Sequence, residues 1–217
     1  MVLGHYGVAL AAKRLAPRAC LGWLLAAAVA VDLIWPVFLL LGLEHVRIWP
    51  GLMAANPLDF YDYPITHSLA TGVGWGLLAA GLYFALNRDA LGARVIAWLV
   101  VSHWFLDLLM HRPDLPVYPG GPMLGLGAWN SVALTIGLEV VVFGAGIAVY
   151  LRTTVAKGPQ GQWALWGFVV LFGLAYFASL LGPPPGDART LAWAALLQWL
   201  IVPWGWWIDA QRSVRAS

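Results

Sequence analysis

Residues 101–114 of the chain read VSHWFLDLLMHRPD, and this stretch closes a long apolar run that begins near Val95. Such a run is typical of a helix that crosses a membrane. It nevertheless carries His103, Asp107 and His111, each four residues after the last, and side chains at that spacing share one helical face. An ionisable group inside a membrane is costly and normally faces a partner in the protein interior. The stripe therefore predicts a site or a set of buried pairs.

The composition indicates an integral membrane protein. Hydrophobic residues make up 61% of the 217 residues and charged residues only 10%, whereas soluble domains carry about 25% charged residues. The net charge of +2 gives no reason to expect binding to nucleic acid. The length suits a single domain, residues 1–217. The one cysteine, Cys20, excludes an internal disulfide and a cysteine-based metal cluster.

Six segments reach the length of about 20 mostly apolar residues that a spanning helix needs. They are Ala19–Leu43, Thr66–Leu86, Arg94–Met110, Trp129–Leu151, Trp163–Leu181 and Leu191–Ile208. Clusters of helix-breaking residues, such as the three prolines and glycine at 183–186, separate them. The expected fold is an all-α, polytopic membrane helical bundle. Residues 1–115 carry the motifs, and residues 116–217 are expected to be scaffold helices.

The distribution of positive charge predicts the orientation, because Lys and Arg favour cytoplasmic loops. With the N-terminus cytoplasmic, nine of the 12 Lys and Arg residues lie inside, and three lie outside. Both termini are then cytoplasmic. At 1.5 Å per residue, His103, Asp107 and His111 lie about 14, 20 and 26 Å from Arg94 at the inner end of the third span. The stripe therefore occupies the outer half of the membrane.

Further ionisable residues in or near the apolar segments are His5, Asp32, His67 and Glu139. Helical rise places Asp32 at a depth close to that of Asp107. A short N-terminal half-helix from Leu3 to Leu15, dipping inward, would raise His5 by about 12 Å toward the same depth. Any one of these residues could be a structural hydrogen-bonding group. Several at one depth favour a metal or proton site over structural pairing.

Imidazole and carboxylate together suit a divalent metal, with zinc preferred and manganese or iron as alternatives. His67, His103 and Asp107, with Asp32 or His5, would leave one position open for a reactive water. A remaining carboxylate, Asp32 or Glu139, would act as the general base.

Four motifs follow one another in an order that resembles a known family. They are LGHYG at 3–7, VAVDLIWP at 29–36, PITHSL at 64–69 and VSHWFLDLLMHRPDLP at 101–116. They resemble the bacterial inner-membrane proteins described as LexA-regulated, membrane-bound metal-dependent hydrolases, over about the first 115 residues. The resemblance implies a bacterial inner-membrane location and a hydrolase activity. It maps His5, Asp32, His67, His103 and Asp107 onto the polar positions of that family.

The chain departs from the family pattern at two positions of possible ligands, and Tyr63-Pro64-Ile65 stands where an Arg-Gly-Phe usually precedes the THS motif. Ile34 and Trp35 stand where the family has a second Asp and a His. The resemblance then leaves open a site for one metal ion in place of two, or for none. His111 is the preferred replacement ligand, with Asp114 as the second candidate.

Two classes of function follow from these observations. The leading hypothesis is a membrane-embedded hydrolase acting on a lipid or lipid-phosphate head group, because a site in the outer half of the bilayer is reached most easily from the lipid. The alternative is a non-enzymatic protein: an accessory subunit of a larger membrane complex, a metal or proton conduit, or a family member that keeps only the fold. Membrane lipid is the expected partner, and a homo-oligomer or larger complex is compatible with the sequence.

Overall fold

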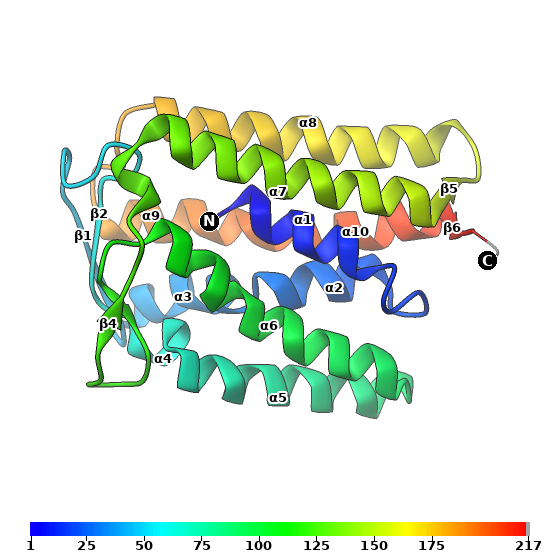
Figure 1. Cartoon of the computed structure of the whole chain (residues 1–217), viewed down its shortest axis with the longest axis horizontal. Helices are drawn as coiled ribbons and strands as arrows, with labels where there is room; N and C mark the ends of the chain where they lie inside the picture. The colour runs from blue at the N-terminus through cyan, green and yellow to red at the C-terminus, as the bar shows by residue number, and fades with distance from the viewer. Residues whose placement is uncertain (216–217) are drawn as a thin grey trace.

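The computed structural model describes residues 1–215 as a bundle of helices (Figure 1). The helices are α1 (Leu3–Ala12), α2 (Leu21–Ala28), α3 (Ala30–Leu41), α4 (Pro64–His67), α5 (Leu69–Asn87), α6 (Ala90–Met110), α7 (Val132–Thr153), α8 (Pro159–Leu181), α9 (Ala188–Ala195) and α10 (Ile201–Ala210), with 3₁₀ turns η1 (Ala128–Asn130) and η2 (Leu196–Leu200). Short strands form three antiparallel pairs: β1 (His45–Ile48) with β2 (Leu58–Asp62), β3 (Leu115–Pro116) with β4 (Met123–Leu124), and β5 (Thr154–Ala156) with β6 (Arg212–Val214). The predicted all-α membrane bundle is confirmed, and the strands are small additions to it.

Within residues 1–215, five helical segments are long and apolar enough to cross a membrane: α5, α6, α7, α8 and the stretch Ala188–Ala210. The bent pair α2 and α3 provides a sixth. Within its most apolar 18 residues, α6 is 44% buried in the protein, against 17–22% for the other four. The helix that carries the polar stripe is therefore the central one, and the others turn most of their surface outward.

The first span differs from the single helix expected over Ala19–Leu43. It breaks at Val29, whose backbone (φ −119°, ψ 22°) is not helical, and α2 and α3 meet at 56°. Val29 is β-branched, which slightly lowers helix propensity, and a run of apolar residues does not reveal a backbone break. α3 ends at Gly42, where a φ of +68° favours glycine. The break leaves the carbonyl of Ala28 available to side chains.

The predicted N-terminal half-helix is present as α1, and it packs along α7. The two helices touch backbone to backbone at Gly7 and Gly146. A Cβ atom at either position would overlap the backbone of the other helix. Small residues permit this close approach between membrane helices. At the far end of α1, Lys13 is buried and its Nζ lies 2.7 Å from Oδ1 of Asp209. Both ends of the half-helix are thus fixed.

The short strand pairs mark the two ends of the bundle (Figure 1). The β1–β2 end carries the connections on either side of α4 and after α6, and the β5–β6 end carries the C-terminus. Met1 lies among the helices and is only 4% exposed. Side-chain caps begin several helices: Ser68 accepts from the amide of Thr71 in α5, and Asp89 accepts from that of Gly92 in α6. The amino group of Met1 pairs with Asp107, so the first residues of the chain sit next to the C-terminal part of α6.

Candidate metal centre

Four helices deliver the predicted polar residues to one place. α6 contributes His103 and Asp107, which stand one turn apart on its buried face. α1 contributes His5 from its first turn, and α4 ends at His67. α3 contributes Asp32 from the turn that follows the break at Val29. Residues separated by up to 102 positions in the sequence therefore meet in the protein interior.

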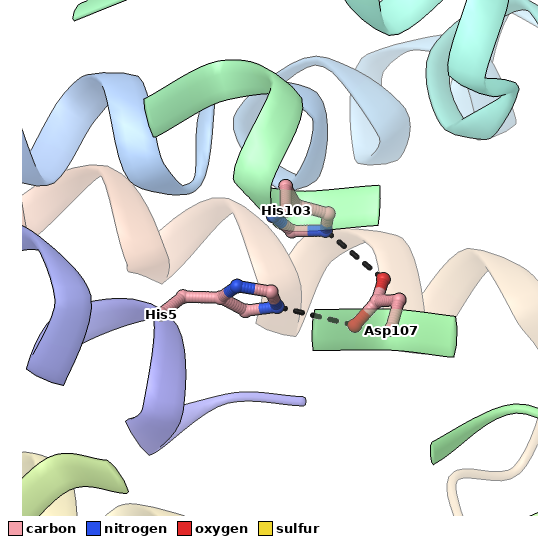
Figure 2. A group of neighbouring side chains, drawn as sticks. All are labelled: His5, His103 and Asp107. Carbon is pink, nitrogen blue, oxygen red and sulfur yellow. Dashed lines mark hydrogen bonds and ion pairs between the residues drawn. The ribbon is translucent and has the colours of Figure 1, made fainter. Parts of the chain in front are cut away.

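Asp107 is the centre of the first group, which Figure 2 shows. Its Oδ1 lies 3.1 Å from Nε2 of His5, and its Oδ2 lies 3.1 Å from Nε2 of His103. The two imidazole rings stack in parallel, with centroids 3.8 Å apart and an interplanar angle of 3°. The amino nitrogen of Met1 lies 2.5 Å from the same Oδ1. The carboxylate thus faces three nitrogen atoms.

Asp32 is the centre of the second group. Its Oδ1 lies 3.3 Å from Nε2 of His67 and 3.6 Å from Nε2 of His103. One donor atom each from Asp32, His67 and His103 lie within 4.8 Å of one another, and the same holds for His5, His103 and Asp107. The two groups share His103, so the cluster is continuous.

The cluster is almost fully shielded. His5, His67, His103 and Asp107 are each no more than 6% exposed, whereas the side chain of Asp32 is 22% exposed. Charged groups buried this deeply need a partner or a bound ion. The one accessible edge of the cluster is therefore at Asp32.

Hydrogen bonds on the far sides of the rings fix which ring nitrogen carries the proton. Nδ1 of His103 lies 2.9 Å from the carbonyl of Ala28, which can only accept, so Nδ1 donates. Nδ1 of His111 lies 2.8 Å from the Asp114 carboxylate and donates to it. Nδ1 of His67 lies 2.7 Å from the hydroxyl of Thr66. Metal-binding histidines characteristically hold the non-ligating nitrogen in this way.

In a neutral imidazole that donates through Nδ1, Nε2 carries a bare lone pair. In a neutral His103 this lone pair would face the oxygens of two carboxylates, which are also electron-rich. Nε2 of His103 and Nδ1 of His5 are buried without a hydrogen-bond partner within residues 1–215. A cation between these atoms removes the repulsion, and the mixed nitrogen and oxygen donors suit a divalent metal. The single lone pair of His103 allows only one of the two groups to use it at a time.

Glu139 stands beside the cluster, but its carboxylate is already engaged. Oε1 accepts from the amide of Val2 at 2.7 Å, and Oε2 accepts from the amide of Gly4 at 2.8 Å. These are amides at the beginning of α1, which have no partner within the helix. Glu139 therefore holds α1 against α7, and Asp32 is the carboxylate better placed to accept a proton.

His111 lies next to the cluster and outside both three-residue groups. Its Nε2 is 3.9 Å from Oδ2 of Asp107. Asp114, the other replacement considered for the missing ligands, binds Nδ1 of His111 and Nε of Arg112 instead of facing the cluster. Burial and the nearby Asp114 carboxylate raise the pKa of Tyr63 well above its usual value, and its protonated hydroxyl donates to the carbonyl of Asp114 at 3.0 Å. Asp114 is thus a support for His111.

Two further buried carboxylates near the site could not be identified from the sequence. Asp59 in β2 is 3% exposed and pairs with Arg47 at 2.9 Å and Arg112 at 2.6 Å. Glu44, just before β1, is fully buried and contacts Thr66. Both lie in connections that read as outer loops, and only their pairing in space identifies them.

A small cavity of about 10 Å³ adjoins the cluster, with space for about one water molecule. His67 and His103 line it together with Ser68, Gly72 and Trp104. Residues of α3, α4, α5 and α6 contribute to its lining, and it gives a small group a place beside both imidazoles.

The fold and the cluster together define a polytopic helical membrane protein with a buried group of histidines and aspartates. Comparisons of the chain with protein-family models, curated proteins and solved structures found no match. The chemistry of the cluster follows from its own donor atoms, distances and burial.

Proposed function

We propose that the protein is a membrane-embedded metal-dependent hydrolase. One divalent ion would be held by side chains of the cluster, drawn from His5, Asp32, His67, His103 and Asp107. The observation that carries the proposal is the position of His103, whose Nδ1 donates to the carbonyl of Ala28 while its Nε2 lies 3.6 Å from Oδ1 of Asp32 and 3.1 Å from Oδ2 of Asp107. Zinc fits this donor set best, and manganese and iron are the alternatives.

When bound, such an ion acts as a Lewis acid and lowers the pKa of a water molecule to about 7. The chain's own residues supply the rest. Asp32 accepts a proton at its accessible carboxylate, since both oxygens of Glu139 are taken by backbone amides. Trp104 and Gly72 bound the cavity that admits a small group to His67 and His103. The buried surroundings exclude other water.

The proposed substrate is a membrane lipid or lipid phosphate. Nine of the 12 Lys and Arg residues belong to segments at the β5–β6 end, and Arg47, Arg112 and Arg189 belong to the β1–β2 end. The positive-inside rule then favours a cytoplasmic location for the β5–β6 end, which carries the C-terminus and the end of α1, whereas Met1 itself is buried beside Asp107. The cluster lies toward the β1–β2 end of α6, which corresponds to the outer leaflet. A bacterial inner membrane is the location that the resemblance of the N-terminal motifs implies.

A conduit for ions or protons is the less favoured alternative. The part of α6 between its first turn and His103 buries Ile96, Leu99 and Val100. These side chains offer no polar atom to relay a proton or hold an ion. A site that closes on the inner side fits catalysis at one face better than passage through the membrane.

The proposal is tested by hydrolysis in reconstituted vesicles that contain dioleoyl phosphatidate, with release of inorganic phosphate as the readout. We expect the purified protein to release phosphate, a chelator to stop it, and Zn²⁺, Mn²⁺ or Fe²⁺ to restore it. His103→Ala should be inactive, whereas His45→Ala, which alters a half-exposed histidine paired with Asp62, should retain activity. Equal rates with and without chelator, or in His103→Ala, would contradict the proposal.

A further inference from the structure

Glu44 is a charged side chain with no exposed surface, placed between the end of α3 and the start of β1. Its Oε1 accepts from the amides of Ile65 at 2.7 Å and Thr66 at 2.9 Å. Its Oε2 accepts from the hydroxyl of Thr66 at 2.6 Å. Three donors thus compensate the burial of one carboxylate.

The contact with Glu44 fixes the direction of the Thr66 hydroxyl. A hydroxyl has one proton, and Thr66 gives it to Oε2 of Glu44. Toward Nδ1 of His67, at 2.7 Å, the same oxygen can therefore only accept. Nδ1 of His67 must carry the proton, and its Nε2 then faces Asp32 as a bare lone pair.

We propose that Glu44 and Thr66 are positioning residues that hold His67 in the tautomer required for metal binding. This inference rests on the proposed metal site. Without the hydroxyl of Thr66, His67 is free to protonate at Nε2 and to donate to Oδ1 of Asp32, which lies 3.3 Å away. That hydrogen bond would engage Nε2 of His67 and Oδ1 of Asp32, and neither atom could then bind the metal ion.

A purely structural role for Glu44 is separable from this one. The two backbone amides that it accepts hold the beginning of α4 whether or not Thr66 has a hydroxyl. Thr66→Val keeps the shape of the side chain and both hydrogen bonds from the backbone amides to Glu44, and it removes the hydroxyl that joins Oε2 of Glu44 to Nδ1 of His67. Thr66→Ser restores the hydroxyl. Thr71→Val is the matched control, because Thr71 bonds Ser68 and the carbonyl of Pro64 and is not in contact with His67.

The experiment measures two quantities in purified full-length protein: the Kd for Zn²⁺, and the ¹⁵N chemical shifts of the His67 ring without metal. We expect Thr66→Val to bind Zn²⁺ about 10- to 100-fold more weakly, and its His67 to shift toward the Nε2-protonated form. Thr66→Ser and Thr71→Val should match the wild type in both measurements. Wild-type affinity and an unchanged tautomer in Thr66→Val would overturn the inference.

The ring shifts also separate this inference from the metal proposal. If the wild type binds no metal ion, the proposed function fails. Thr66 is still shown to set the tautomer if His67 carries its proton on Nδ1 in the wild type and on Nε2 in Thr66→Val. The same His67 tautomer in the wild type and in Thr66→Val would overturn the inference that Thr66 sets this tautomer.

Discussion

The contact between α1 and α7 offers the sharpest test of how the half-helix completes the site. Any side chain at position 146 would overlap backbone atoms of Gly7. Ordinary non-bonded contacts lie at about 3.5–4.0 Å, so in Gly146→Leu α1 has to move by roughly 1 Å or more. Overpacking of this kind destabilises a protein by about 1–3 kcal/mol.

The same displacement should be felt at the metal centre. Metal ligands tolerate deviations of only about 0.2 Å in distance, and His5 lies on α1 one half-turn before Gly7. Gly146→Leu should therefore weaken metal binding as well as lower the free energy of unfolding. Gly144→Leu is the matched control, because a Cβ at Gly144 meets nothing within 4 Å.

The assay pairs unfolding in mixed detergent micelles with a titration of Zn²⁺. Gly146→Leu should lose about 1–3 kcal/mol of stability and bind Zn²⁺ more weakly, whereas Gly144→Leu should be close to the wild type in both. If Gly146→Leu loses stability but keeps wild-type affinity for Zn²⁺, His5 is not a ligand. If Gly146→Leu changes neither the stability nor the affinity for Zn²⁺, the described packing of α1 against α7 is contradicted.

Two further predictions concern the helices around the cavity. Gly72→Ala should stabilise the protein by about 0.5–1 kcal/mol, since alanine suits a helix interior better and its Cβ has free space, whereas Gly76→Ala should destabilise it because its Cβ would lie 2.9 Å from the carbonyl of Ala97. Equal changes in the free energy of unfolding of the two variants would contradict the described packing of α5 against α6. Asp89→Ala should cost about 1 kcal/mol at neutral pH. The amide of Gly92 lowers the pKa of Asp89 below its ordinary value of 3.8, so this contribution is present above pH 3.8 and is lost as the pH falls through the lowered pKa. A cost that persists in unfolding measurements at pH 2 would contradict the cap.

The fold could be predicted from the sequence to the level of its spans. Long apolar runs identify membrane helices because the bilayer selects their length and composition. The break at Val29 escaped prediction, because residues on both sides of it are apolar and hydropathy carries no information on backbone angles. The β1–β2 hairpin also escaped prediction, because its charged residues pair across the turn and with Arg112, which follows α6.

The site could be predicted in part. The four-residue spacing on α6 places His103 and Asp107 on one face, and helical rise brings Asp32 to the same depth. The sequence could not show that Glu139 is engaged by the amides of α1, since that depends on how α1 packs. Glu44 was missed for the same reason. A charge in a connection looks solvated until the fold buries it.

The most direct test of the central claim is the metal content of the purified wild-type protein, measured by mass spectrometry beside His103→Ala and His45→Ala. Both three-residue groups use His103, and its Nε2 has one lone pair. The account predicts about one equivalent of zinc, manganese or iron in the wild type and in His45→Ala, and almost none in His103→Ala. A metal-free wild type, or equal metal in His103→Ala, would contradict it.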